Sequence, residues 1–383
     1  MIQSIETKGV HIKSWVTNLE EGALEQAVTL AELPYTFHHV ALMPDCHLGY
    51  GMPIGGVLAT KDVVIPNAVG VDIGCGMRVI KTNIIATDPD LDLQVIIDKV
   101  KEVVPTGFKR HNETNSLWDK YKFMFQADLS NEVWDVAGKS LGTLGGGNHF
   151  IEFQVDEEGL LAVMVHSGSR NLGKQICDYY NSIAKCECET NYSIWEKDLA
   201  FISKVSKSYE EYLDDMGFCV EYAEDNRALI MAEVKTCINE VFGAYRVVEE
   251  HDVAHNYAEL EEHYGNRVMV HRKGATSALK GELGIIPGSQ GTASYIVEGL
   301  GNKDSFCSCS HGAGRKMGRA QAKRTLDLEA QQELMQGILC DMDSTAKLDE
   351  APGAYKDIDE VMYDQRDLVK IVSKLVPLGV IKG

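Results

Sequence analysis

Apolar and polar residues follow two different spacings along this chain. Short apolar runs, such as LLAVMV before His166 and RVMV before His271, end at polar or glycine-rich stretches and predict β-strands. Longer stretches repeat their apolar residues at helical spacing, and they predict helices over 91–104, over much of 195–243 and over 319–339. Because strands and helices interleave, we expect a mixed α/β (α+β) fold with a mixed β-sheet core and surrounding helices.

Glycine marks the loops between these elements. The 35 glycines cluster in short polar stretches, several of which directly follow a predicted strand. A strand that ends in a glycine-rich polar loop places functional groups on a rigid scaffold. Residues 175–265 are poorer in glycine and richer in acidic residues, so they predict a helical layer or subdomain. With no repeat and no Pro/Ser-rich linker, we expect one main domain over 1–383.

Composition and charge narrow the class of protein. The chain has 383 residues, of which 44% are hydrophobic and 25% charged, and no apolar run reaches the roughly 20 residues of a transmembrane helix. Its net charge of −20 argues against a general nucleic-acid binder but allows a local basic site. No secretory signal opens the chain, and its 10 cysteines are scattered without a C-x-x-C pair. We therefore expect a cytoplasmic protein with reduced thiols.

The stretch VGVDIGCGM holds a carboxylate and a thiol three residues apart, Asp72 and Cys75. Both side chains can reach one metal ion from such a loop, and a thiolate can bridge two ions. The alternative is a small buried cysteine beside an aspartate that supports a turn. Taken alone, the two residues fit the alternative better.

Two further histidines stand at the ends of glycine-rich or apolar runs. GGGNHFIEF places Asn148, His149 and Glu152 directly after three glycines, and His166 follows a predicted strand. Neutral imidazole is a common ligand of transition metals. Arg170, four residues after His166, is a candidate phosphate ligand because its guanidinium group binds phosphate oxygens bidentately.

The stretch EEHDVAHNYAE offers a second kind of pair. On a helix, His251 and His255 would share a face at i and i+4 and could chelate one metal. Without the glutamate of an H-E-x-x-H motif, and with acidic flanks, two surface histidines are the better interpretation. The context of four other histidines is more informative, because His149, His166, His271 and His311 all lie at a strand end or beside glycines. Together they predict a metal-centred site assembled from several loops.

The stretch SFCSCSHGAGRKMGR combines a histidine, glycines and a basic segment. The glycines after His311 predict a loop whose backbone N–H groups face a phosphate at a helix N-terminus. Five basic residues follow within ten positions: Arg315, Lys316, Arg319, Lys323 and Arg324. The alternative is a solvated basic helix face. The loop PGSQGT is suited to backbone contacts with a ligand as well.

Ten of these motifs occur together in one order. They are MPDCHLGYG, VGVDIGCGM, GGGNHFIE, HSGSRNLG, AHN, HRKGAT, PGSQGT, SHGAGR, APGAYKD and the C-terminal GVIKG. In this combination the chain resembles the RtcB family of GTP- and manganese-dependent RNA ligases, as a short bacterial-type member. The resemblance runs from about residue 43 to the last residue.

The resemblance implies a definite reaction and definite partners. It implies that RNA ending in a 2′,3′-cyclic phosphate or 3′-phosphate is joined to RNA with a 5′-hydroxyl, with GTP as co-substrate and two Mn²⁺ ions. A histidine becomes guanylylated, GMP passes to the RNA 3′-phosphate, and the 5′-hydroxyl displaces it. No membrane partner is implied, and nothing points to a particular activating protein.

The resemblance also assigns residues. His311 matches the guanylylated histidine. The matches to the manganese ligands are Asp72, Cys75 as the bridging thiolate, His149, His166 and His255. The matches to nucleotide and phosphate contacts are Asn148, Glu152, Arg170, Ser289, Gly312, Ala313, Gly314, Arg315, Tyr355 and Lys382. Cys307 and Cys309 then become packing residues, and RNA is expected at Arg170 and along the basic segment after His311.

Two other functions compete with this interpretation. One is a dinuclear-metal phosphodiesterase or phosphatase that lacks GTP chemistry. The other is a non-catalytic RNA-binding subunit. The presence of His311, Tyr355 and Lys382 favours the ligase over a hydrolase, which needs no guanine pocket, and the full ligand set favours an enzyme.

Overall fold

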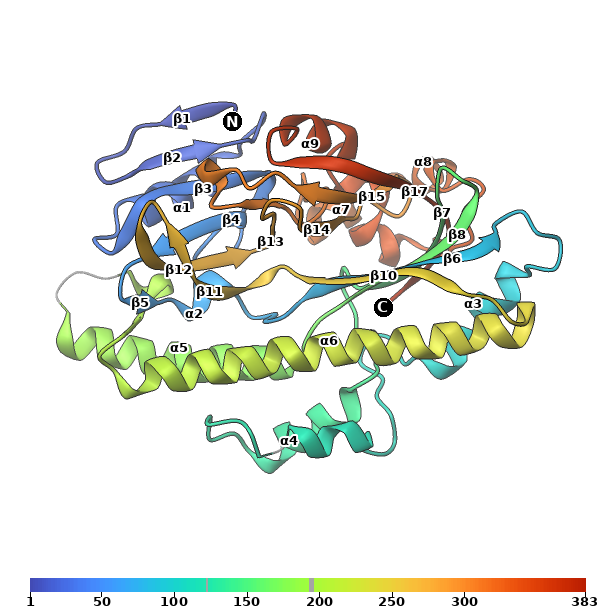
Figure 1. The fold of residues 1–383 in the computed structure, drawn as a ribbon, viewed down its shortest axis with the longest axis horizontal. Coiled ribbons are helices and arrows are strands. Elements are labelled where there is room, and N and C mark those ends of the chain that lie inside the picture. Colours follow the sequence, from blue (N-terminus) through green and yellow to red (C-terminus); the bar gives the residue numbers. More distant parts are fainter. Residues whose placement is uncertain (122, 193–195) are drawn as a thin grey trace.

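Two large sheets lie beside each other above one long helix (Figure 1). The computed structural model describes residues 1–383 apart from 122 and 193–195. The six-stranded sheet has the order β1 (Gln3–Ile5), β2 (His11–Ser14), β3 (Thr36–His47), β4 (Ile54–Thr60), β12 (Asn266–Lys273) and β11 (Asn256–His263). Its strands pair antiparallel except β2 with β3.

The second sheet has seven strands and is antiparallel throughout its described pairs. Its order is β10 (Val247–Ala254), β6 (Gly76–Ile85), β8 (Leu160–Ser167), β7 (Phe150–Val155), β17 (Val369–Lys382), β15 (Ser294–Gly299) and β14 (Leu283–Ile286). Two short pairs complete the strands: β5 (Val63–Val64) with β9 (Ile202–Ser203), and β13 (Ala275–Ser277) with β16 (Ser308–Ser310).

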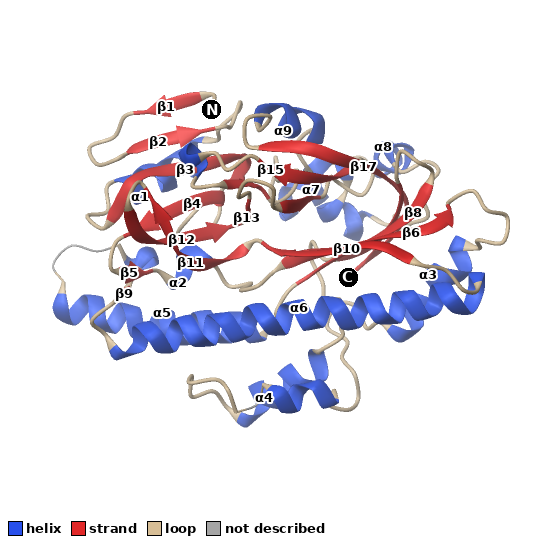
Figure 2. Cartoon of the chain, viewed as in Figure 1, coloured by secondary structure: helices blue, strands red, loops and turns tan. Residues whose placement is uncertain are grey.

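Helices cover one side of both sheets, and the helices nearest the C-terminus in sequence gather around β15 and β17 (Figure 2). The α-helices are α1 (Glu21–Ala31), α2 (Pro66–Val69), α3 (Leu93–Val103), α4 (Asn131–Ser140), α5 (Leu172–Asn191), α6 (Lys207–Phe242), α7 (Arg319–Thr325), α8 (Leu328–Leu334) and α9 (Ile358–Asp364). Short 3₁₀ turns are η1 (Ser116–Lys120), η2 (Lys197–Leu199), η3 (Lys303–Ser305), η4 (Thr345–Glu350) and η5 (Pro352–Ala354).

The 36-residue helix α6 connects two hydrophobic cores. Its N-terminus is capped by Ser206, whose hydroxyl accepts the N–H of Ser208. Near this end Tyr212 packs into the core beneath the six-stranded sheet, and towards the other end Ile230 packs against β6 and β8. Burial along its whole length explains how one helix of this size is stabilised by packing.

One extended segment passes from one sheet into the other. β10 is the edge of the seven-stranded sheet and β11 the edge of the six-stranded sheet, and His255 is the single residue between them. Its backbone N–H donates to the carbonyl of Cys75, at 2.9 Å. The junction of the two sheets therefore brings His255 beside Cys75.

The predicted mixed α/β fold is confirmed, and so are most of its predicted elements. The run before His166 forms β8 and the run before His271 forms β12, while 91–104 contains α3. Within 195–243 the helix begins only at Lys207, and position 195 lies outside the described residues. Residues 175–265 are helical only to Phe242, since β10 and β11 follow.

The prediction of one helix over 319–339 is wrong. The segment forms two seven-residue helices, α7 and α8, with an extended residue at Leu326 between them. The Asp327 carboxylate then accepts the N–H of Ala330 and starts α8. An aspartate that can cap a new helix competes with continuation of the old one.

Two other expectations concern membranes and thiols. In the part of the chain that the structure describes, no helix is both long and apolar enough to cross a membrane. All ten cysteines are free thiols, as expected, and Cys309 is fully buried in the core between the sheets.

Candidate metal centre and catalytic cleft

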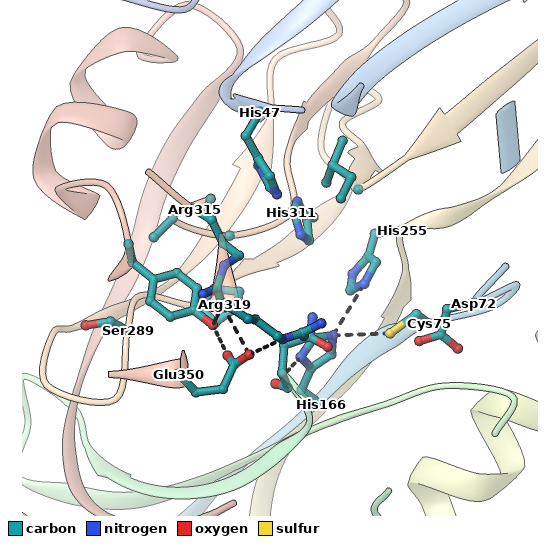
Figure 3. A pocket seen from close by; sticks show the side chains of 18 of the residues that line it. His47, Asp72, Cys75, His166, His255, Ser289, His311, Arg315, Arg319 and Glu350 are labelled. Atoms are coloured by element: carbon teal, nitrogen blue, oxygen red, sulfur yellow. Dashed lines mark hydrogen bonds and ion pairs between the residues drawn. The ribbon is translucent and has the colours of Figure 1, made fainter. Parts of the chain in front are cut away.

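A cleft of about 710 Å³ opens where the two sheets meet. Its walls come from the ends of β3, β8 and β17, the loop before β6, the start of β7, the β10–β11 junction and the loop after β16. Figure 3 shows His311, His255, His166 and Cys75 in one part of it and Glu350 with Arg315 and Arg319 in another. The cleft thus has a metal-ligating side and a side rich in ion pairs.

Five predicted ligands converge at the bottom of the cleft. The Cys75 sulfur lies 3.3 Å from Nε2 of His166 and 3.6 Å from Nε2 of His149. Nε2 of His255 lies 3.4 Å from Nε2 of His166, and Oδ2 of Asp72 lies 3.3 Å from Nε2 of His149. Two groups of three result, one with Cys75, His166 and His255 and one with Asp72, Cys75 and His149, and they share the sulfur.

Hydrogen bonds on the outer ring nitrogens turn the inner lone pairs towards each other. Nδ1 of His149 donates to the carbonyl of Leu144, and Nδ1 of His166 donates to the carbonyl of Asn148. Their Nε2 atoms then face a thiol, a carboxylate and another imidazole. Nδ1 of His255 is buried with no hydrogen-bond partner among the described residues. Carbonyl-anchored imidazoles around a shared sulfur form a donor set that fits two divalent cations.

The electrostatics of these groups agree with a metal centre. Burial lowers the pKa of His166 and of His255 well below the usual value, so both are neutral, as a ligand must be. Burial also raises the pKa of Cys75 well above its usual value, and the charge of Asp72 adds to this. A bound divalent cation reverses that effect, because it stabilises the thiolate.

Two neighbouring residues of α6 hold the ligand loops together. The guanidinium group of Arg227 donates to the carbonyls of Gly74, at 2.9 Å, and Ser167, at 3.1 Å, and pairs with Asp252. The side chain of Asn226 accepts the N–H groups of Gly142 and Thr143. The two side chains therefore fix the loops before Cys75, after His166 and before His149.

His311 lies between the two sides of the cleft, with its ring orientated by Asp45. Oδ2 of Asp45 accepts both the backbone N–H of His311, at 3.1 Å, and its Nδ1–H, at 2.6 Å. Burial pushes the pKa of Asp45 upward, but the charge and hydrogen bond of His311 outweigh it and the pKa is lowered. Nε2 of His311 is not hydrogen-bonded to any described residue, and the ring centre lies 4.9 Å from that of His255. Because Asp45 is hydrogen-bonded to Nδ1, Nε2 is the ring nitrogen that is left for nucleophilic attack beside the cation site.

The other side of the cleft is organised by Glu350. Its carboxylate accepts from Arg315 at 3.1 Å and from Arg319 at 2.8 Å, and it is hydrogen-bonded to the Tyr355 hydroxyl. Lys382 lies 3.9 Å away. The guanidinium of Arg315 also stacks over the Tyr355 ring, with 5.1 Å to the ring centre. Glu350 thus orientates three of the predicted nucleotide contacts, Arg315, Tyr355 and Lys382.

The structure places the remaining predicted contacts around this side. The cleft is lined by Asn148, Glu152, Ser289, Gly312, Ala313 and Gly314. Burial raises the pKa of Glu152 to about 8, although Gln154 and Lys382 oppose it. Gly314 has a φ of +73° and packs against the Asp45 backbone so closely that a Cβ would lie 2.2 Å from its carbonyl oxygen. This turn therefore needs glycine.

Arg170 lies behind the main cleft instead of in its wall. Its Nε donates to Thr143 at 3.1 Å, and Nη1 lies 3.4 Å from Nδ1 of His149. The side chain lines a second, smaller hollow on the other side of the glycine loop.

Two histidine predictions are wrong in their details. His271 lies inside β12, fully buried, where it donates to the carbonyl of Leu58 and accepts the N–H of Ile65. It is a satisfied core histidine that does not line the cleft. The interpretation of His251 and His255 as two surface histidines is wrong for His255, which is buried and lines the cleft. The alternative of a shared helix face does not hold either, because 247–254 is a strand.

The basic segment after His311 also differs from the expectation. The helix α7 begins at Arg319, so the glycines form a turn against β3 instead of opening a helix. Arg315 and Arg319 pair with Glu350, and Lys323 pairs with Asp349. Acids contributed by η4 therefore neutralise much of the positive charge that was expected to hold RNA.

Sequence reasoning missed three contributors, although their motifs were visible. Asp45 lies inside MPDCHLGYG, Asn256 follows His255 in AHN, and Glu350 directly precedes APGAYKD. Asn256 donates to the carbonyl of Asp72, at 3.0 Å, and accepts the N–H of Gly274. Each of the three is a charged or amide residue inside or beside a motif, which was the available signal. Its role was not predictable because the residue it contacts lies far away in the sequence.

Comparison with known proteins decides the family. The RtcB profile, described as tRNA-splicing ligase RtcB, matches residues 26–383. The chain belongs to the RtcB family. It is 37% identical to the RNA-splicing ligase RtcB of Escherichia coli K12, over 99% of each chain. It is 33% identical to the tRNA-splicing ligase RtcB of Pyrobaculum aerophilum, over 94% of this chain and 91% of the relative.

Relatives in other bacteria give the same result. The RNA-splicing ligase RtcB of Mycobacterium bovis is 32% identical over 94% of this chain and 100% of its own length. The RtcB match covers the five predicted metal ligands, His311 and the predicted nucleotide contacts, up to Lys382.

Proposed function

We propose that this chain is a GTP- and manganese-dependent RNA ligase that joins RNA 2′,3′-cyclic phosphate or 3′-phosphate ends to 5′-hydroxyl ends. The observation that carries the proposal is the Asp45–His311 pair, whose free Nε2 stands beside the buried cluster of His, Cys and Asp donors. Membership in the RtcB family, whose relatives are named RNA- or tRNA-splicing ligases, supports RNA as the substrate class.

In the first step, Nε2 of His311 attacks the α-phosphorus of GTP. A P–N bond forms, the P–O bond to the β-phosphate breaks, and pyrophosphate leaves with that electron pair. The Nδ1–H remains hydrogen-bonded to Asp45, at 2.6 Å, and the carboxylate stabilises the positive charge that the ring acquires.

The remaining cleft residues bind the nucleotide. Ser289, Tyr355 and Lys382 contact the guanine side, and the turn of Gly312 to Gly314 lies against the phosphates. With a pKa of about 8, Glu152 is mostly protonated at neutral pH, so it can donate a hydrogen bond to a phosphate oxygen. Arg315 is held in place for the nucleotide by Glu350.

Two Mn²⁺ ions, when bound, neutralise triphosphate charge and orientate the reacting oxygens. The residues that would hold them are Asp72, Cys75, His149, His166 and His255, with Cys75 shared. Burial keeps His166 and His255 neutral. Backbone carbonyls orientate His149 and His166.

In the later steps GMP is transferred and then released. An oxygen of the RNA 3′-phosphate attacks the phosphorus of the histidine adduct, the P–N bond breaks, and His311 regains its Nε2 lone pair. The 5′-hydroxyl of the second RNA end then attacks the RNA phosphate, loses its proton, and displaces GMP. A 2′,3′-cyclic phosphate is first opened by water to a 3′-phosphate.

A ligation assay tests the function. One labelled RNA with a 2′,3′-cyclic phosphate and one RNA with a 5′-hydroxyl are incubated with the protein, GTP and Mn²⁺, and we expect a joined product. His311→Asn should abolish joining, whereas the control His251→Asn, outside the cleft, should not. Release of the terminal phosphate without joining would indicate a phosphatase or phosphodiesterase instead.

We further propose that residues 1–383 work as one catalytic unit in the cytoplasm. Residues from both sheets line one cleft, which supports a single unit. Ten free thiols suit a reducing compartment.

A further inference from the structure

A second hollow of about 430 Å³ lies beside the loop that leads to His149. It is lined by Phe108, Lys109 and Arg110 on one side and by Gly146, Gly147 and Arg170 on the other. None of the residues 107–110 has a role in the main cleft, so the hollow requires its own explanation.

Both sides of the hollow are attached to the same glycine loop. The N–H of Gly107 donates to the carbonyl of Gly145, at 2.8 Å, and the N–H of Leu144 donates to the carbonyl of Pro105, at 2.9 Å. Arg170 passes directly under Gly145, where an added Cβ would lie 1.9 Å from Nη1. A ligand in the hollow is therefore held in a fixed position relative to His149.

Phe108 is an aromatic residue in an unusual environment. Its side chain is 99% exposed, and the adjacent Gly107 has open space around the position of a Cβ. Folding gains nothing from such a side chain, because it buries no surface. A flat, exposed ring at the rim of a hollow is typical of a stacking platform for bases.

Two of the positive charges that line the hollow have no acidic partner in the described part of the chain. Neither Lys109 nor Arg110 forms an ion pair with any residue that the structure describes. Arg170 adds a third positive charge to the lining of the hollow. By contrast, Arg315, Arg319 and Lys323 are paired with acids, in a chain whose net charge is −20. Unpaired clustered cations in an acidic protein favour a polyanion.

We propose that this hollow binds a nucleotide in the single-stranded RNA segment that leads to the reacting end. The base stacks on Phe108, and the phosphates beside it contact Lys109, Arg110 and Arg170. This subsite rests on the proposed RNA-ligase function, and it places part of the RNA contact at 107–110 instead of at the paired basic segment after His311.

Binding of a short single-stranded RNA with a 3′-phosphate tests the subsite, measured by fluorescence anisotropy on the full-length protein. Phe108→Ala should raise the Kd about tenfold, and Phe108→Trp should retain the affinity. The double variant K109Q/R110Q should reduce the slope of log K against log salt by about 1.4 for two lost phosphate contacts. The exposed Lys8 and Lys280 line neither cavity, so K8Q/K280Q is the matched control and should not change the slope.

Guanylylation without RNA separates this subsite from the proposed function. All these variants should form the protein–GMP adduct at the wild-type rate and with the wild-type dependence on GTP. That result would exclude the hollow as a binding site for free GTP. Wild-type affinity in Phe108→Ala, or an unchanged salt slope in K109Q/R110Q, would overturn the subsite while leaving the ligase function intact. RNA binding with the expected dependences but no GMP adduct in the wild-type protein would overturn the function and leave the subsite standing.

Discussion

At the scale of single residues, one carboxylate decides what His311 can do. Oδ2 of Asp45 accepts two N–H groups of His311, so the Nδ1–H tautomer is fixed and Nε2 keeps its lone pair. Lys356 donates to the carbonyls on both sides of Asp45 and holds the carboxylate in place. His311 is therefore a preorganised nucleophile, and Asp45 is its positioning residue.

Replacing Asp45 by Asn should slow guanylylation by about 10³-fold, because an amide can present its N–H₂ to Nδ1 and favour the wrong tautomer. Rapid-quench measurement of the GMP adduct gives the rate. Mn²⁺ should raise the thermal unfolding midpoint of Asp45→Asn as much as that of wild type, since Asp45 is not a metal ligand. An unchanged adduct rate would contradict the positioning role.

Buried His271 should make the protein sensitive to acid. Burial lowers its pKa from 6.5 to about 4, so between these values the unfolded chain binds a proton that the folded chain does not. Stability should therefore decrease as the pH falls below 6.5. In His271→Gln, the amide oxygen can still accept the N–H of Ile65. Between pH 7 and pH 5, the free energy of unfolding of this variant should decrease by about 2 kcal/mol less than that of wild type. Urea unfolding at the two pH values measures the difference, and equal losses would refute the assignment.

The metal-ligand residue types were predictable from sequence, but their partners were not. Cys75, His149 and His166 stand in glycine-rich or strand-end contexts that the sequence displays. His271 stands in the same context and is a core residue, because local pattern does not reveal which loops meet. Glu350 was invisible as a site residue, since its four partners are brought to it only by the folded chain.

At the scale of elements, α6 is the support of the metal centre. It was predicted as a helix from its spacing, but its function comes from which side chains face the ligand loops. Arg227 and Lys235 both project from α6 and both pair with acids of β10, Asp252 and Glu250. Only Arg227 also donates to the loops that carry Cys75 and His166.

Arg227→Gln should weaken Mn²⁺ binding by about 10- to 100-fold, because residues that orientate ligands contribute that much to metal affinity. Lys235→Gln is the matched control and should bind Mn²⁺ as wild type does. The double variant R227Q/D252N removes both partners of this ion pair and should show the same loss. Calorimetric titration measures the affinity, and wild-type binding by folded R227Q/D252N would contradict the support role.

At the scale of the whole molecule, the cleft exists only when the complete chain is folded. Its residues come from both sheets and range from the end of β3 to the end of β17. The motifs of the resemblance identified most of the residues in the cleft from sequence. Two features belong to the assembled fold and were not predicted: the junction of β10 with β11, and the ion pair of Arg315 with Glu350. Metal binding should consequently stabilise the entire structure.

Mn²⁺ should raise the thermal unfolding midpoint of the metal-free protein, because a ligand that binds only the folded state adds about 2.7 kcal/mol at a concentration of 100 Kd. Cys75→Ala removes the ligand shared by both groups and should abolish the increase. Scanning calorimetry with and without a chelator checks this. An equal increase in Cys75→Ala would show that the stabilising ion binds elsewhere.

The most direct test of the central claim is the location of the GMP adduct. The protein is incubated with GTP labelled at the α-phosphate and Mn²⁺, and the adduct is isolated and mapped by mass spectrometry. We predict an acid-labile phosphoramidate on His311, absent from His311→Asn and present in the His251→Asn control. No adduct in the wild-type protein, or an adduct that persists in His311→Asn, would contradict the account.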